Sequence, residues 1–142
     1  MNLKRILAAA TAALMAAALV ACSDDSDTPQ ENGEPADEKV IDMPDQPGSV
    51  EGYEGAAEDA ELQTCESDGQ ALHVGGTVNN PVSETQDYRI YVSAMDGAET
   101  MGIVQVDVPG VPAGESADWG TELALSSNTL ECVLRVERFP SE

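Results

Sequence analysis

The sequence predicts an all-β domain, a small sandwich of two packed antiparallel sheets, in the C-terminal part of this 142-residue chain. Three observations predict it. From residue 61 onward, short runs of β-branched and apolar residues alternate with polar ones. Gly, Pro, Asn and Asp separate these runs at the spacing of turns. No window has the apolar period of a long amphipathic helix.

Six segments of this region have the pattern of strands. In residues 72–78 and 88–94 the apolar side chains recur at every second position, as on one face of a strand. Asp96-Gly97 follows the second of them and is a turn dipeptide, because both residues tolerate positive φ. The predicted strands cover residues 61–65, 72–78, 88–95, 103–108, 117–123 and 130–136.

The start of the chain has the pattern of an export signal. Lys4 and Arg5 precede an uncharged run from Ile6 to Ala21 that contains neither Gly nor Pro. This run is short and rich in Ala, whereas a transmembrane helix usually needs about 20 strongly apolar residues. We therefore expect it to be cleaved.

The residues Leu19-Val20-Ala21-Cys22 resemble the lipobox of bacterial lipoproteins. The resemblance implies that residues 1–21 are a lipoprotein signal peptide and that the thiol of Cys22 receives a diacylglycerol. Two or three acyl chains would hold the protein stably on the extracytoplasmic face of the cell membrane. The alternative is an ordinary secretory signal cleaved after Ala18, with Cys22 incidental.

Residues 22–60 are mostly Asp, Glu, Pro, Gly, Ser, Asn and Gln, and only Lys39 offsets their carboxylates. Such a segment buries too little apolar area to compensate for ordering, and its like charges repel. We therefore predict a disordered acidic linker over residues 22–60 and a folded domain over residues 61–142. The alternative for Asp24, Asp25 and Asp27, a calcium site, lacks the Gly and the distal Glu of a calcium loop.

The chain has three cysteines. With Cys22 lipidated, only Cys65 and Cys132 can pair, near the start and the end of the domain, and export places them where disulfides form. A structural disulfide is therefore predicted, which would contribute about 4 kcal/mol on the chain-entropy model. The alternative, a redox pair, lacks a Cys-x-x-Cys motif and a helix N-terminus.

The domain resembles the FxLYD-type and related immunoglobulin-like domains of bacterial surface lipoproteins, actinobacterial ones in particular. The likeness rests on residues 76–80 (Gly-Thr-Val-Asn-Asn), 92–97 (Val-Ser-Ala-Met-Asp-Gly) and 112–115 (Pro-Ala-Gly-Glu), and on Trp119. At the signature itself only Asp96 is retained. The resemblance implies a small immunoglobulin-like antiparallel β-sandwich and no shared chemistry.

The sequence offers few residues in patterns typical of catalysis or metal binding. His73 is the only histidine, and it lies on the face opposite Leu72 and Val74, toward solvent. One histidine without paired ligands provides neither a zinc site nor a Ser-His-Asp triad. Paired carboxylates of a glycosidase would need a deep cleft, which so small a domain rarely builds. We expect Tyr88 and Trp119 in the core rather than stacked on a ligand, and we expect no enzyme, cofactor or metal.

The charge of the chain restricts its partners. With 27 acidic and 6 basic residues the formal net charge is −21, which excludes a nucleic-acid-binding function on electrostatic grounds. The charge also keeps the domain away from anionic lipid, so that the membrane is contacted through the lipid anchor on Cys22. We expect Arg89, Arg135 and Arg138 to offset neighbouring carboxylates, and Tyr91 to face outward.

Two function hypotheses follow. The first is a membrane-anchored, non-enzymatic interaction module that binds an envelope protein or a matrix component. The alternative is a structural or stress-related envelope lipoprotein that presents a hydrated acidic surface.

Overall fold

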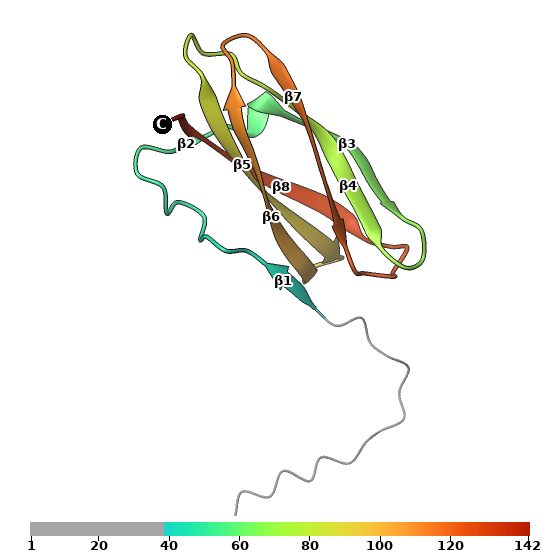
Figure 1. Ribbon diagram of the computed structural model, residues 1–142. Helices are drawn as coiled ribbons and strands as arrows, with labels where there is room; N and C mark the ends of the chain where they lie inside the picture. Colours follow the sequence, from blue (N-terminus) through green and yellow to red (C-terminus); the bar gives the residue numbers. More distant parts are fainter. Residues whose placement is uncertain (1–38) are drawn as a thin grey trace, which may run out of the picture. The chain divides into compact units, whose positions relative to one another are not determined.

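The computed structural model describes residues 39–142 (Figure 1). The predicted signal peptide, Cys22 and the first part of the predicted linker lie outside these residues. The described elements are β1 (Val40–Asp42), β2 (Glu54–Gly55), the 3-10 helix η1 (Ala57–Asp59), β3 (Ala60–Ser67), β4 (Leu72–Asn79), β5 (Gln86–Asp96), β6 (Glu99–Val111), β7 (Ser116–Leu123) and β8 (Glu131–Pro140).

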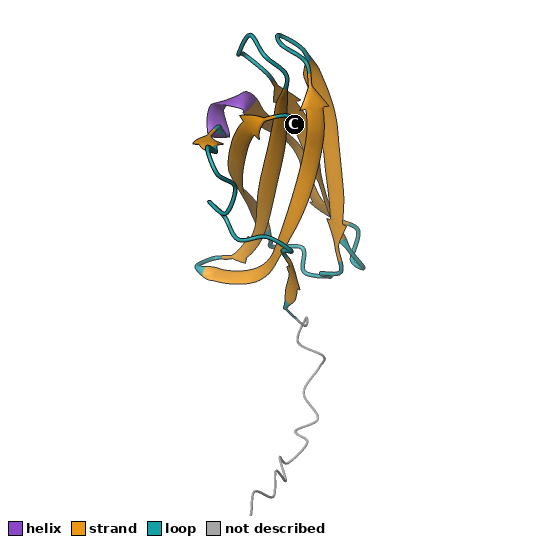
Figure 2. Cartoon of the chain, turned by 60° about the vertical axis from the view of Figure 1, so that its left-hand side comes forward, coloured by secondary structure: helices purple, strands orange, loops and turns teal. Residues whose placement is uncertain are grey.

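The strands form two packed sheets, so the predicted all-β sandwich is confirmed (Figures 1 and 2). One sheet has the order β1-β6-β5-β8-β2 and the other β3-β4-β7. Every pairing is antiparallel except that of β1 with β6. The six predicted strands correspond to β3 through β8, and several extend beyond the predicted ends.

The alternation seen in the sequence determines which faces meet in the core. On β4, Leu72, Val74 and Val78 are buried, whereas His73 and Thr77 between them are partly exposed. Tyr88, Ile90, Val92 and Ala94 form the matching inner face of β5 and are fully buried. Trp119 of β7 also lies in the core, at 6% exposure, as predicted.

Glycine is required at two positions in this framework. A Cβ on Gly76 would collide with the backbone carbonyl of Glu61, so β3 and β4 approach closely only because no side chain stands between them. Gly97 has φ of 58° in the turn between β5 and β6, which the Asp-Gly dipeptide predicted.

A disulfide joins the two sheets, as predicted. Cys65 of β3 is bonded to Cys132 of β8, and their Cα atoms are 6.0 Å apart. β3 is an edge strand of its sheet, and β8 is followed only by the two-residue strand β2. The bond therefore closes the sandwich on the side where the two sheets have few other connections.

The predicted linker is wrong over residues 40–60, which belong to the folded domain. β1 pairs with β6 at one margin of the larger sheet and β2 pairs with β8 at the other, so residues 43–53, here called the strap, cross its outer face (Figure 1). Along the way the strap contacts successive strands. The amide of Asp45 donates to Gln105 Oε1 of β6 at 3.0 Å, and that of Gly48 donates to Glu137 Oε1 of β8 at 2.9 Å.

The composition of this segment predicted disorder because it contains few apolar residues. The strap is held instead by specific hydrogen bonds and ion pairs. The carboxylate of Asp45 lies 3.0 Å from the guanidinium of Arg89 on β5. Just beyond the strap, Ala56 enters the core at 4% exposure, and its amide donates to the carbonyl of Val136 at 2.9 Å. The folded domain thus begins about 20 residues earlier than residue 61.

Removal of the disulfide tests its contribution to stability. We expect the Cys65→Ser/Cys132→Ser variant to lose about 4 kcal/mol of unfolding free energy, because the unfolded chain regains the entropy of a large open loop. Urea unfolding followed by tryptophan fluorescence measures this loss. A reductant should destabilise the parent protein and leave the variant unchanged, and equal stability of the two proteins would contradict the prediction.

Candidate functional site

The outer margin of β8 is one of the unpaired strand edges of the described fold. β8 pairs with β5 along its length, from Glu131 opposite Met95 to Pro140 opposite Gln86. On its other side β2 pairs only with Glu137 and Arg138. Within residues 39–142, no strand pairs with residues 131–135 of β8 on that side. We call this stretch the free edge.

The backbone alternation shows which groups the free edge presents. The carbonyl of Val136 accepts from Ala56 and therefore points away from β5. Residues two apart on a strand direct their N–H and C=O groups the same way, so Cys132 and Leu134 also point outward. Unpaired groups of this kind are a template for another strand.

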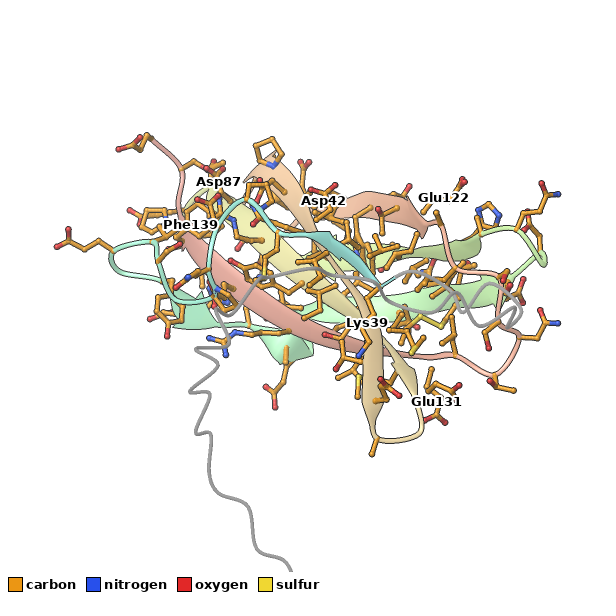
Figure 3. The ribbon with its side chains drawn as sticks, turned by 90° about the horizontal axis from the view of Figure 1, so that it is seen from below. Lys39, Asp42, Asp87, Glu122, Glu131 and Phe139 are labelled. Carbon is orange, nitrogen blue, oxygen red and sulfur yellow. A yellow bond between two sulfur atoms is a disulfide. The ribbon has the colours of Figure 1, made fainter. Side chains whose placement is uncertain are left out.

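The side chains of the free edge divide between two faces. Cys132 and Leu134 point inward and pack against the core. Glu131, Val133 and Arg135 lie on the outer face, where Val133 is 55% exposed and the Arg135 side chain likewise 55%. Figure 3 shows Phe139 and Glu131 toward the two ends of β8, with the free edge at the Glu131 end. An apolar side chain therefore stands exposed between two opposite charges.

A groove continues from the free edge toward the other end of β8. Its volume is about 940 Å³, and it is lined by residues Leu134 through Arg138 of β8, by Tyr53 of the strap, by η1 and by Pro81. The lining mixes an aromatic ring and aliphatic carbon with charged groups of both signs. This composition suits a peptide or protein segment better than a small apolar ligand.

Arg138 closes the groove at the β2 end. Its guanidinium lies 2.7 Å from Glu54 Oε2 and 2.6 Å from Asp59 Oδ2, and its side chain is only 15% exposed. The hydrogen bond to Glu54, together with the one to Asp59, raises the pKa of Arg138 above its usual range. Arg138 is therefore a structural tie that fixes β2 and η1 against β8.

Arg135 is differently placed, because its side chain reaches into solvent. Its Nε and Nη2 donate to Glu137 Oε1 at 3.0 and 2.9 Å. The hydrogen bond to Glu137 raises the pKa of Arg135. The guanidinium is thus held on the outer face beside the free edge and keeps room for a further carboxylate.

Beneath the strap lies a buried polar layer. Glu137 is 1% exposed and Tyr91 2%, although both are on the outer face of the sheet. The Tyr91 hydroxyl and Glu137 Oε2 have no hydrogen-bond partner among the described residues. Burial raises the pKa of Tyr91. Tyr91 does face outward, as predicted, but the strap covers it.

The remaining residues singled out in the sequence serve structural roles. Tyr88 is buried and donates its single hydroxyl hydrogen to Asp59 Oδ2 at 3.0 Å, with the carbonyl of Asn79 as a second acceptor at 3.3 Å. Arg89 binds Asp45 and Asp107 at 3.0 and 2.7 Å, so it offsets carboxylates as predicted. Within residues 39–142, no cluster of three or more His, Cys, Asp or Glu side chains could hold a metal ion.

His73 lies on the outer face of β4 and is partly exposed, as predicted. Its Nε2 is 3.0 Å from Asp68 Oδ2 and its Nδ1 is 3.5 Å from Glu122 Oε2. The hydrogen bond to Asp68 raises the pKa of His73, and the same contact lowers the pKa of Asp68.

Sequence reasoning did not identify the free edge, although one signal was present. In residues 130–136 the even positions are apolar, yet Val133 is apolar as well and falls on the polar face. An apolar residue at an outward position indicates either a covered face or an exposed contact surface. The order of the strands in the sheet decides whether such a residue is covered or exposed. That order cannot be read from the order of the strands along the chain.

The chain matches no protein-family model, no curated protein and no solved structure. In the part of the chain that the structure describes, no helix has the length and apolar character needed to cross a membrane. The description of the two-sheet domain and its disulfide therefore rests on the structure of this chain alone.

Two tyrosines permit a matched test of the buried polar groups. Tyr88→Phe removes the hydroxyl that contacts Asp59 and Asn79 and should lower the unfolding free energy by about 1–2 kcal/mol. Tyr91→Phe removes a hydroxyl that has no partner among the described residues and should leave stability unchanged or raise it. Chemical denaturation of both variants measures the difference, and a larger loss for Tyr91→Phe would contradict the assignment.

The His73 contacts predict a pH dependence. Because the folded pKa of His73 is raised, its contribution to stability is fully present below its unfolded pKa of 6.5 and is lost as the pH rises through the folded value. Urea unfolding of the parent and of His73→Gln between about pH 5 and pH 9 measures it. The difference between the two proteins should shrink as the pH rises, and a constant difference would refute the coupling.

Proposed function

We propose that this chain is a lipoprotein, anchored through Cys22 to the extracytoplasmic face of the cell membrane, whose folded domain is a non-enzymatic interaction module. The lipobox at residues 19–22 supports the anchor. The Cys65–Cys132 disulfide supports an oxidising compartment, since such bonds are rare in cytosolic proteins.

The observation that carries the interaction role is the free edge of β8 beside its groove. Unpaired backbone groups at Cys132 and Leu134 supply hydrogen bonds of strand geometry, and Val133 offers apolar area next to them. Native proteins usually protect such an edge with a bulge, a proline or charged side chains. Residues 131–135 have no bulge and no proline, and their two charges are of opposite sign.

We propose further that the domain is immunoglobulin-like and related to the FxLYD type. Gly76 at the closest approach of β3 and β4, the Asp96-Gly97 turn and the buried Trp119 support this relation, since each holds the position that the resemblance implies. The relation concerns the fold and carries no chemistry.

A second candidate function, the presentation of a hydrated acidic surface, is favoured by the charge. The basic side chains of residues 39–142 are Lys39, Arg89, Arg135 and Arg138, and acidic residues outnumber them several-fold. In this role the acidic faces would matter and the free edge would not. Neutralising Asp118 and Glu122 on β7 would then impair the protein more than altering Val133.

The anchor is tested with Cys22→Ser in the native host. The parent protein should incorporate labelled palmitate and fractionate with membranes, because two acyl chains hold a protein stably where one does not. Cys22→Ser should incorporate no label. Labelling of the variant would show that Cys22 is not the acceptor.

The interaction role is tested by photo-cross-linking in living cells. A photoreactive residue in place of Tyr53, which lines the groove, should capture a discrete protein of the envelope. The same residue in place of Asp118, an exposed position on β7, is the matched control. Identical products from both positions would remove the support for a binding role of the groove.

A further inference from the structure

The free edge of β8 is complementary to a second copy of itself. Residues 131–135 read Glu-Cys-Val-Leu-Arg. If two copies pair antiparallel about Val133, Glu131 of each lies opposite Arg135 of the other, and Cys132 lies opposite Leu134. Opposite charges therefore meet on both sides of the centre, and the two exposed valines meet at it.

The backbone geometry agrees with this register. Cys132 and Leu134 direct their N–H and C=O groups outward, as the contact between Val136 and Ala56 shows for this parity. In an antiparallel pair, two outward-directed residues placed opposite one another exchange both of their hydrogen bonds. Val133 then occupies the non-hydrogen-bonded position, where facing side chains approach most closely. A register shifted by one residue would place hydrogen-bonding groups against groups that already bind β5.

The side chains on the outer face of β8 also agree with the antiparallel register about Val133. Val133 is 55% exposed and would be covered by its counterpart. Glu137 already holds Arg135 on this face, with contacts of 2.9 and 3.0 Å, so the guanidinium is pre-positioned for Glu131 of the second copy. Glu131 is exposed and has no ion-pair partner in the part of the chain that the structure describes.

The other margins lack this complementarity. β7 carries Asp118 and Glu122 and no basic residue, so a symmetric pairing about Gly120 would place acid against acid. β3 carries Glu61 and Glu66, also without a basic residue, and a bulge interrupts it between Leu62 and Thr64. β1, the edge strand at the other margin of the larger sheet, exposes Ile41 at 74%, but a symmetric pairing about Ile41 would place Asp42 opposite Val40 and would pair no opposite charges. Among the described edge strands, β8 therefore alone combines free backbone groups, an exposed apolar side chain and opposite charges at symmetric positions.

We propose that two copies of this chain associate through their free edges, antiparallel about Val133, and join their larger sheets into one continuous sheet. This inference rests on the interaction role proposed above and names a second copy as the occupant of the edge. The net charge of the chain opposes association, so screening by salt should strengthen the dimer, whereas salt would weaken the binding of a basic partner.

The test uses the mature chain from residue 22 with Cys22→Ser, exported to an oxidising compartment so that Cys65 and Cys132 form their bond. Sedimentation velocity over a range of protein concentrations should show a monomer–dimer equilibrium that shifts toward the dimer between low salt and about 0.5 M NaCl. Glu131→Arg places two arginines opposite each other and should raise the dimer dissociation constant by at least about tenfold. Asp118→Arg on β7, at the margin of the smaller sheet opposite to β3, makes the same charge change away from the edge and should not weaken the dimer.

Cysteine cross-linking tests the register. Val133→Cys should form an intermolecular disulfide on mild oxidation, because the two copies of residue 133 face each other. Glu131→Cys, two residues away on the same face, should not, because its counterpart would lie beyond disulfide reach. Circular dichroism of each variant checks that the domain is folded.

Three results would overturn the proposal: a parent chain that stays monomeric at all salt concentrations, an unchanged dimer in Glu131→Arg, or equal cross-linking of the two cysteine variants. A monomer that still yields specific envelope cross-links from position 53 would leave the interaction role standing and would show that the edge takes a different partner. A dimer that yields no such cross-links would support the pairing of two copies and would contradict the binding of an envelope protein in the groove.

Discussion

The guanidinium of Arg138 binds Glu54 and Asp59 and thereby determines how the N-terminal part of the domain meets β8. In the contact with Asp59 the Arg138 side chain is 15% exposed and the Asp59 side chain 11%, so water competes with this ion pair less than with a surface one. The Glu54 side chain is 69% exposed. The two contacts hold β2 and η1 against the last third of β8 and bring Ala56 into the core. The covered part of β8 ends there, and residues 131–135, with the disulfide-bonded Cys132 among them, remain as the free edge.

The period-two alternation was sufficient to predict β4 through β8, because each of these strands buries one face. β3 was predicted only as a short run at the start of the domain, and none of its residues is fully buried. The disulfide followed from the cysteine count and from the predicted lipidation and export of the chain. The strap could not be predicted by composition, since its stability comes from Asp45 and Gly48 reaching partners 60 and 89 residues away. Contacts so distant in sequence depend on the strand order, which no local pattern specifies.

Tyr91 and Val133 show how the same local signal can have two meanings. Both side chains are largely hydrocarbon and lie at outward positions of neighbouring strands, so the local pattern does not distinguish them. The strap covers Tyr91, which is 2% exposed, and stops short of Val133, which is 55% exposed. The difference arises from the path of residues 43–53 over the sheet. An outward apolar residue therefore identifies a contact surface only once the strand order shows what lies over it.

The symmetry of the proposed dimer bears on the proposed anchor. Two antiparallel edges that continue one sheet are related by a twofold axis normal to that sheet, so the outer faces of both copies, each with its strap, point the same way. Residue 39, where each described domain begins, then lies on equivalent margins of one continuous surface. The pairing therefore gives the two copies of residue 39 equivalent positions, which agrees with the proposed anchoring of both copies to one membrane.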